Sequence, residues 1–107
     1  MENKLSLQAL KLWASSMSSE AVTGYSDLLY WCPIRNYLGV VWTSHTYFMS
    51  RRGDREIHPL PLAFSNLIKS IDRIGRLPYR VHAEISAGLL LELISRVELD
   101  MSLMFTA

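Results

Sequence analysis

The sequence predicts a mainly α-helical fold, a small bundle of about four to five helices. Apolar residues return at the spacing of one helix face in several segments. The chain is 50% apolar and 20% charged, which excludes the disordered classes, and its 107 residues suffice for one core. We therefore expect a single globular domain over residues 1–107. An α+β fold with strands near residues 38–49 and 79–87 is the alternative.

The first predicted helix covers residues 6–19. Leu7, Leu10 and Ala14 follow one another at helical spacing, and Ser6 stands where a residue that caps the N-terminus is expected. These positions predict an amphipathic helix with one face in the core.

Residues 33–49 carry two conflicting signals. The run from Val40 to Thr43 favours a strand by its β propensity. Pro33, however, suits the first position of a helix. The residues that share one helical stripe are Ile34, Tyr37, Leu38, Val41, His45, Phe48 and Met49. We predict a helix, because a stripe sustained over several turns rarely arises by chance.

A polar loop and the clearest helix come next. Residues 50–61 contain Gly, Pro and several charged residues, which is typical of a surface loop. Pro61 then opens a helix whose apolar residues, from Phe64 to Ile74, keep a spacing of three and four. Gly75 stands where a helix commonly ends.

Residues 79–87 also allow two interpretations. Apolar and polar residues alternate from Tyr79 to Ala87, as in a strand. Pro78 and the good helix formers of the same segment favour a helix, which we predict. Residues 88–99 are helical on either interpretation, and the apolar end at 101–105 is expected to dock on the core or on a partner.

The cellular location follows from what the chain lacks. Cys32 is the single cysteine, so no intrachain disulfide can form. The first residues lack the features of a signal peptide, and the longest uncharged stretch, residues 36–50, is too short and polar to span a membrane. We expect a cytoplasmic protein with no membrane partner.

The residues with catalytic or metal-binding chemistry are few and scattered. His45, His58, His82 and Cys32 show no ligand spacing, and the isolated glycines form no phosphate-binding loop. We expect His45 at the edge of the core and His58 and His82 at the surface. Cys32 sits in an apolar run, which predicts a raised thiol pKa, although a Cys–His pair formed in space stays open. We predict no enzyme, no metal and no cofactor.

The charge distribution is more informative. The net charges of residues 1–50, 51–80 and 81–107 are 0, +4 and −3, so the middle is basic and the end acidic. The basic segment resembles a helix-turn-helix, with Arg73 and Arg76 placed for phosphates. The candidate nucleic-acid-binding residues are Arg51, Arg52, Arg55, Arg73, Arg76, Tyr79 and Arg80. Charged helix faces that pair with each other or with solvent explain the same pattern, and we prefer this, because nucleic-acid-binding domains are usually more basic.

One family resemblance concerns this second hypothesis. Leu12-Trp13-Ala14, Gly24-Tyr25-Ser26, Ile71-Asp72-Arg73 and Leu77 resemble positions of phage antitermination proteins of the Q type, which begin with a tryptophan-bearing helix and end in a helix-turn-helix-like region. The match is scattered over roughly half the chain, and its motifs are unspecific. It implies a phage- or mobile-element-encoded transcription regulator that binds nucleic acid.

The first hypothesis for function is protein binding. Three Trp, five Tyr, three Phe and five Met are many for so short a chain, and interface cores are rich in these residue types. They predict a small non-enzymatic regulator or inhibitor that binds another protein or a second copy of itself. The candidate partner-binding residues are Trp31, Trp42, Met104 and Phe105.

Overall fold

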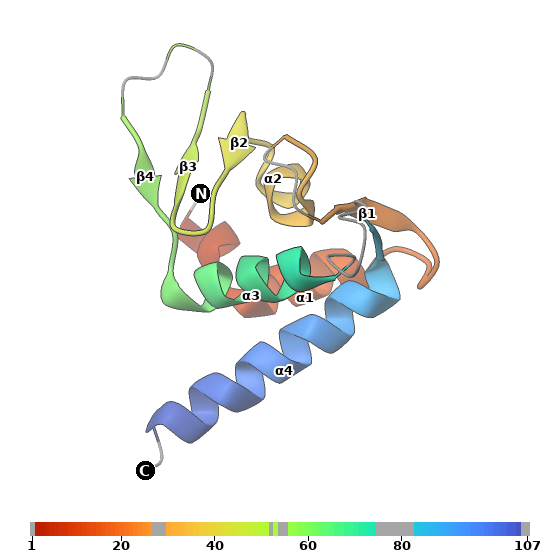
Figure 1. Cartoon of the computed structure of the whole chain (residues 1–107). Coiled ribbons are helices and arrows are strands. Elements are labelled where there is room, and N and C mark those ends of the chain that lie inside the picture. Colours follow the sequence, from red (N-terminus) through yellow and green to blue (C-terminus); the bar gives the residue numbers. More distant parts are fainter. Residues whose placement is uncertain (1, 27–29, 52, 54–55, 75–82, 106–107) are drawn as a thin grey trace.

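The structure, a computed structural model, describes residues 2–26, 30–51, 53, 56–74 and 83–105. These residues form an α+β fold with α-helices and two small antiparallel sheets (Figure 1). The prediction of a mainly α-helical bundle is therefore wrong, and the α+β alternative is the correct class. In chain order the elements are a 3-10 turn at Glu2–Leu5, α1 Leu7–Ser15, β1 Val22–Tyr25, α2 Pro33–Leu38, β2 Trp42–Thr43, β3 Tyr47–Met49, β4 His58–Pro59, α3 Leu62–Arg73, β5 Glu84–Ser86 and α4 Ala87–Phe105.

The helix α1 begins where the sequence predicted and ends earlier. The hydroxyl of Ser6 accepts a hydrogen bond from the backbone N–H of Ala9 at 3.1 Å, which caps the N-terminus. At the other end, the Ser16 hydroxyl donates to the carbonyl of Trp13 at 2.6 Å. The serine-rich run after Ser15 competes for backbone groups in this way, so the helix stops there rather than at residue 19.

The predicted helix over residues 33–49 is correct only in its first part. Pro33 starts α2, and Gly39 ends it in the left-handed conformation, with a φ of 68°. Two strands follow instead of further helical turns, because Trp42 pairs with Met49 in an antiparallel hairpin. The β propensity of residues 40–43 therefore outweighs the helical stripe.

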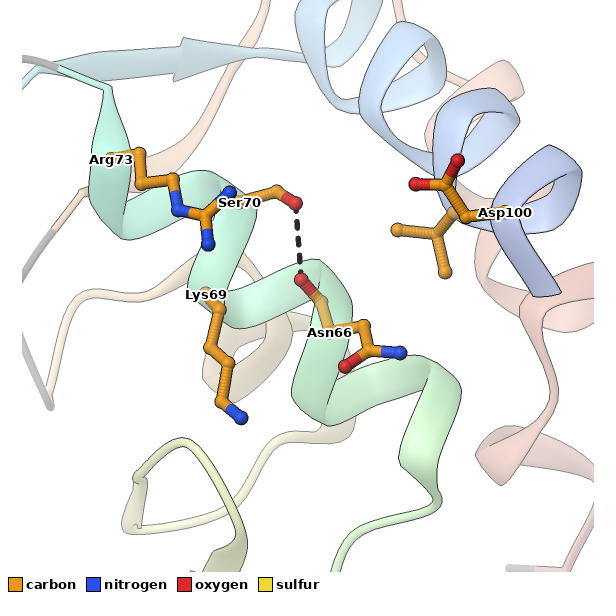
Figure 2. Close-up of a pocket in the computed structure, with 6 residues that line it drawn as sticks. Asn66, Lys69, Ser70, Arg73 and Asp100 are labelled. Carbon is orange, nitrogen blue, oxygen red and sulfur yellow. Dashed lines mark hydrogen bonds between the residues drawn. The ribbon is translucent and has the colours of Figure 1, made fainter. Parts of the chain in front are cut away.

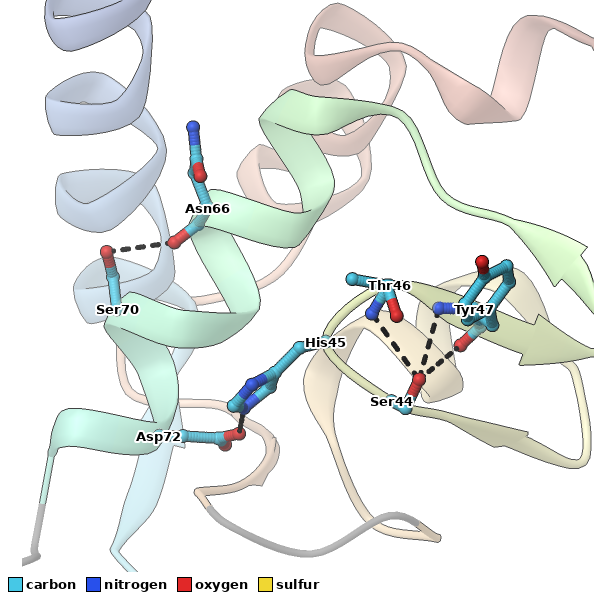
Figure 3. Close-up of polar contacts among 7 residues, drawn as sticks. All are labelled: Ser44, His45, Thr46, Tyr47, Asn66, Ser70 and Asp72. Atoms are coloured by element: carbon cyan, nitrogen blue, oxygen red, sulfur yellow. Dashed lines mark hydrogen bonds and ion pairs between the residues drawn. The ribbon is translucent and has the colours of Figure 1, made fainter.

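The first sheet contains β2, β3 and β4 in that order. A tight turn joins β2 to β3, in which the N–H of Ser44 donates to the carbonyl of Tyr47 at 2.8 Å. The Ser44 hydroxyl accepts a hydrogen bond from the N–H of Tyr47 at 3.1 Å (Figure 3). On the other side of β3, Phe48 pairs with His58. The register of the whole sheet follows from these pairs.

The second sheet consists of β1 and β5. Gly24 pairs with Ile85, and a Cβ at Gly24 would lie 2.4 Å from the carbonyl oxygen of Trp31, so only glycine fits there. The prediction of a helix over residues 79–87 is wrong for β5, because the N–H of Ser26 donates to the carbonyl of Ala83 and holds the chain extended. Residues 79–82 lie outside the described part.

The helices α1 and α3 each pack on α4, and α3 and α4 confirm the predicted helices (Figure 1). The largest side chains that are completely buried come from these helices, from α2 and from β5: Phe64, Leu10, Ile34, Leu67, Ile71, Ile85, Leu90 and Ile94. The hydroxyl of Ser86 accepts from the N–H of Leu89 at 3.1 Å, at the first turn of α4. None of the described helices has the length and apolar character needed to span a membrane.

Candidate binding surfaces

The two faces of the β2–β3–β4 sheet have different surroundings. Side chains alternate between the faces of a strand, so Thr43 and Phe48 share the inner face, and both are buried. Phe48, which is 5% exposed, stacks on His58 with ring centroids 5.2 Å apart. The inner face is therefore part of the core.

The outer face of the same sheet is apolar and faces solvent. Trp42 and Met49 pair across β2 and β3 and are half-buried, whereas Tyr47, opposite Pro59, is 47% exposed. Ile57, which directly precedes β4, is also apolar and is 54% exposed. We call these residues the apolar sheet face: Trp42, Tyr47, Met49, Ile57 and Pro59.

A polar side-chain contact ties this sheet to α3. The Nε2 atom of His45, in the turn between β2 and β3, lies 2.7 Å from Oδ2 of Asp72 (Figure 3). Asp72 is buried, whereas the His45 imidazole is about half exposed. The expectation that His45 lies on a helical stripe is wrong, because the residue sits in a hairpin turn that reaches across to the helix.

Cys32 lies close to this contact but is unsuited to nucleophilic chemistry. Burial raises the pKa of its thiol, and the negative charge of Asp72 raises it further, whereas the nearby backbone of Ile34 and side chain of Thr43 offset part of this rise. The net direction is upward, as predicted from the apolar run. His45 bonds to Asp72 instead of activating this thiol.

The remaining histidines do not assemble a metal site in the described part of the chain. His58 is half-buried against Phe48 rather than solvated, which corrects the expectation of a surface residue. His82 lies outside the described residues. Among the described residues, no three His, Cys, Asp or Glu side chains lie close enough together to hold a metal ion.

The predicted partner-binding residues occupy separate places. Trp42 belongs to the apolar sheet face, whereas Trp31 precedes α2 and is 57% exposed. Met104 and Phe105 lie in the last turn of α4, and their side chains are outside the described part. Sequence reasoning missed Tyr47, Met49 and Pro59, because only the strand pairing brings them together with Trp42, and it missed Ile57, which directly precedes β4.

The predicted helix-turn-helix falls partly outside the described residues, because residues 75–82 follow α3 and are not described. In the described part, the strand β5 precedes α4, and α4 begins at Ala87. Arg51 follows β3 and is exposed, and Arg73 is exposed at the end of α3. The other candidates lie outside the described residues: Arg52, Arg55, Arg76, Tyr79 and Arg80.

A second surface feature lies between α3 and α4. It is a polar groove of about 170 Å³ (Figure 2), and its lining residues are Asn66, Lys69, Ser70, Arg73, Val97 and Asp100. The i, i+4 spacing of Lys69 and Arg73 was visible in the sequence. The position of Asp100 opposite them depends on how α4 packs.

Comparison of the chain with protein-family models, with curated proteins and with solved structures finds no match. The resemblance to phage antitermination proteins therefore gains no support from these comparisons, and function has to be inferred from the surfaces themselves.

Proposed function

We propose that this chain is a small non-enzymatic regulatory or inhibitory protein that binds another protein through the apolar sheet face. The observation that carries the proposal is the outward exposure of Tyr47 and Ile57 beside Trp42, Met49 and Pro59 on a sheet whose other face is buried. A protein partner whose own apolar side chains cover this face removes it from water, at roughly 25 cal/mol per Å² of apolar area.

The composition of the face favours a protein as the partner. Its five residues carry no charge, and aromatic and methionine side chains are enriched in the centres of protein interfaces. Contiguous apolar patches on a monomer are a common sign of an interaction site. Pro59 has no N–H on the edge strand β4, so docking against the face is favoured over the addition of a further strand at this edge.

The rigidity of the face also supports the proposal. Its turn is held by the Ser44 hydrogen bonds and by the contact between His45 and Asp72, and Phe48 anchors its central strand in the core. Binding through a surface that is already ordered costs less conformational entropy than binding through a loop that must first be ordered. A short sheet thus presents its apolar side chains in one arrangement.

Nucleic acid is the second candidate partner. Trp42 and Tyr47 share one sheet face, and exposed Arg51 follows β3, which is a combination that single-stranded nucleic acids use for stacking and phosphate contacts. Met49, Ile57 and Pro59 offer neither a ring for stacking nor a charge for phosphate, so we favour the protein. As part of the same proposal we place the chain in a reducing compartment such as the cytoplasm, where its one thiol stays reduced.

Affinity capture from a native extract, with and without nuclease, tests the proposal. We expect a defined protein partner, or a second copy seen as a dimer by sedimentation, and we expect it to survive nuclease. The double variant Trp42→Ser, Tyr47→Ser should lose that partner. The matched control is Leu12→Ser, which removes an apolar side chain that is 64% exposed on α1, away from the sheet. The proposal would be overturned if the double variant and the control captured the partner equally well, or if every partner were lost on nuclease treatment.

A further inference from the structure

On the α3 side of the groove between α3 and α4 lie two cationic side chains that form no ion pair with the described residues. Lys69 and Arg73 stand one helical turn apart on α3, and both are exposed. Like charges at this spacing repel each other and destabilise a helix. The ion pairs within the described residues join Lys11 to Glu98 and His45 to Asp72, so they leave these two cations without an ionic partner there.

The opposite wall carries a carboxylate. Asp100 lines the groove from α4, across from α3 (Figure 2), and forms no ion pair with Lys69 or Arg73. Val97, a buried residue of α4, lines the groove on the same side as Asp100. The groove therefore presents two positive groups on one side and one negative group on the other.

We propose that this groove binds a small acidic amino acid, at a site separate from the apolar sheet face. A dicarboxylic amino acid carries two carboxylates and one ammonium group, which complement Lys69 and Arg73 on one wall and Asp100 on the other. Arg73 can hold a carboxylate through two parallel hydrogen bonds, whereas Lys69 acts as a point charge.

The size of the groove restricts the ligand. Its volume of about 170 Å³ is smaller than the roughly 300–1,000 Å³ of pockets that hold drug-sized molecules, so a nucleotide does not fit within it. The open, polar walls leave much of the ligand in contact with water. We therefore expect a dissociation constant of about 1 mM.

An NMR titration of the intact chain at low ionic strength tests the proposal with three probes: L-glutamate, glutarate and inorganic phosphate. L-Glutamate should produce saturable shifts at the groove residues. Glutarate keeps both carboxylates but lacks the ammonium group, so it should bind several-fold more weakly, and phosphate more weakly still.

Variants make the test specific. Asp100→Asn should weaken the binding of L-glutamate several-fold, because it removes the attraction between the carboxylate and the ammonium group. The same change should strengthen the binding of glutarate, because it removes the repulsion between Asp100 and the carboxylates of the diacid. Lys69→Gln and Arg73→Gln should weaken both amino acid and diacid. Arg96→Gln is the control, since Arg96 is exposed on α4 but does not line the groove. All four positions are exposed, and circular dichroism checks that each variant folds.

Two outcomes contradict the proposal. The first is the absence of saturable shifts at the groove up to about 10 mM ligand. The second is that the three probes bind equally and that Asp100→Asn does not change the affinities for L-glutamate and glutarate in opposite directions. That result would indicate a nonspecific attraction of anions to Lys69 and Arg73.

Discussion

The two faces of the β2–β3–β4 sheet both carry an aromatic side chain of β3, but only the inner one is buried in the core. On the inner face, Phe48 is 5% exposed and packs in the core. On the outer face, Tyr47, the preceding residue on β3, is 47% exposed. Neighbouring residues of one strand therefore have different roles: the inner one contributes to folding, and the outer one remains available to a partner. Substitutions on the two faces should separate stability from binding.

The largest effect is expected on the inner face. Phe48→Ala removes a buried aromatic side chain and, with it, the stacking contact with His58. The free energy of unfolding should fall by about 3–5 kcal/mol. Urea denaturation followed by circular dichroism measures this change, and a loss below about 1 kcal/mol would show that the inner face is not part of the core.

The contact that orients the sheet should have the next largest effect. His45→Ala removes the hydrogen bond between the imidazole and the buried carboxylate of Asp72, so the free energy of unfolding should fall by about 0.5–1.5 kcal/mol. Thr46→Ala, in the same turn but exposed, serves as the control. Equal stability of the two variants would mean that the contact does not hold the turn.

The buried thiol of Cys32 should make the stability of the protein depend on pH. Its thiol pKa is raised in the folded protein by burial, so its contribution to stability is complete below the thiol pKa of the unfolded chain and is lost as pH rises toward the folded value. Wild type should therefore lose stability relative to Cys32→Ala above about pH 9. Tyr37, whose pKa burial also raises, is common to both chains and cancels. A difference that stays constant from pH 7 to pH 10 would contradict the burial of this thiol.

The smallest effect on stability belongs to the outer face. Tyr47→Ser removes a half-exposed ring that faces solvent, so the free energy of unfolding should change by no more than about 0.5 kcal/mol. The urea midpoint, compared with that of Phe48→Ala, measures the contrast directly. A loss as large as that of Phe48→Ala would assign Tyr47 to the fold instead.

Periodicity in the sequence was sufficient for the helices but not for the sheets. The apolar spacing of α3 and α4 identified both helices, because their faces pack along several turns. In residues 33–49, Tyr37, Leu38 and Phe48 are buried as the stripe predicted, but they reach the core from a helix and a strand separated by Gly39. A single positive φ, which apolar periodicity does not encode, ended the helix.

The candidate surfaces were predictable only in part for the same reason. Trp42 was identified from its residue type, but its neighbours Tyr47 and Ile57 depend on strand register, which is set by the turn at Ser44 and by the pairing of Phe48 with His58. Likewise, the spacing of Lys69 and Arg73 is a local signal, whereas Asp100 joins them through the packing of α4 on α3.

The most direct test of the central claim is the affinity of the captured protein partner for three chains: wild type, Tyr47→Ser and the control Leu12→Ser. If the outer sheet face binds the partner, Tyr47→Ser should reduce the affinity for that partner about tenfold or more, which corresponds to about 1.4 kcal/mol, and leave the urea midpoint unchanged. The affinity of Leu12→Ser should equal that of wild type. Wild-type affinity in Tyr47→Ser, or an equal loss in both variants, would contradict it.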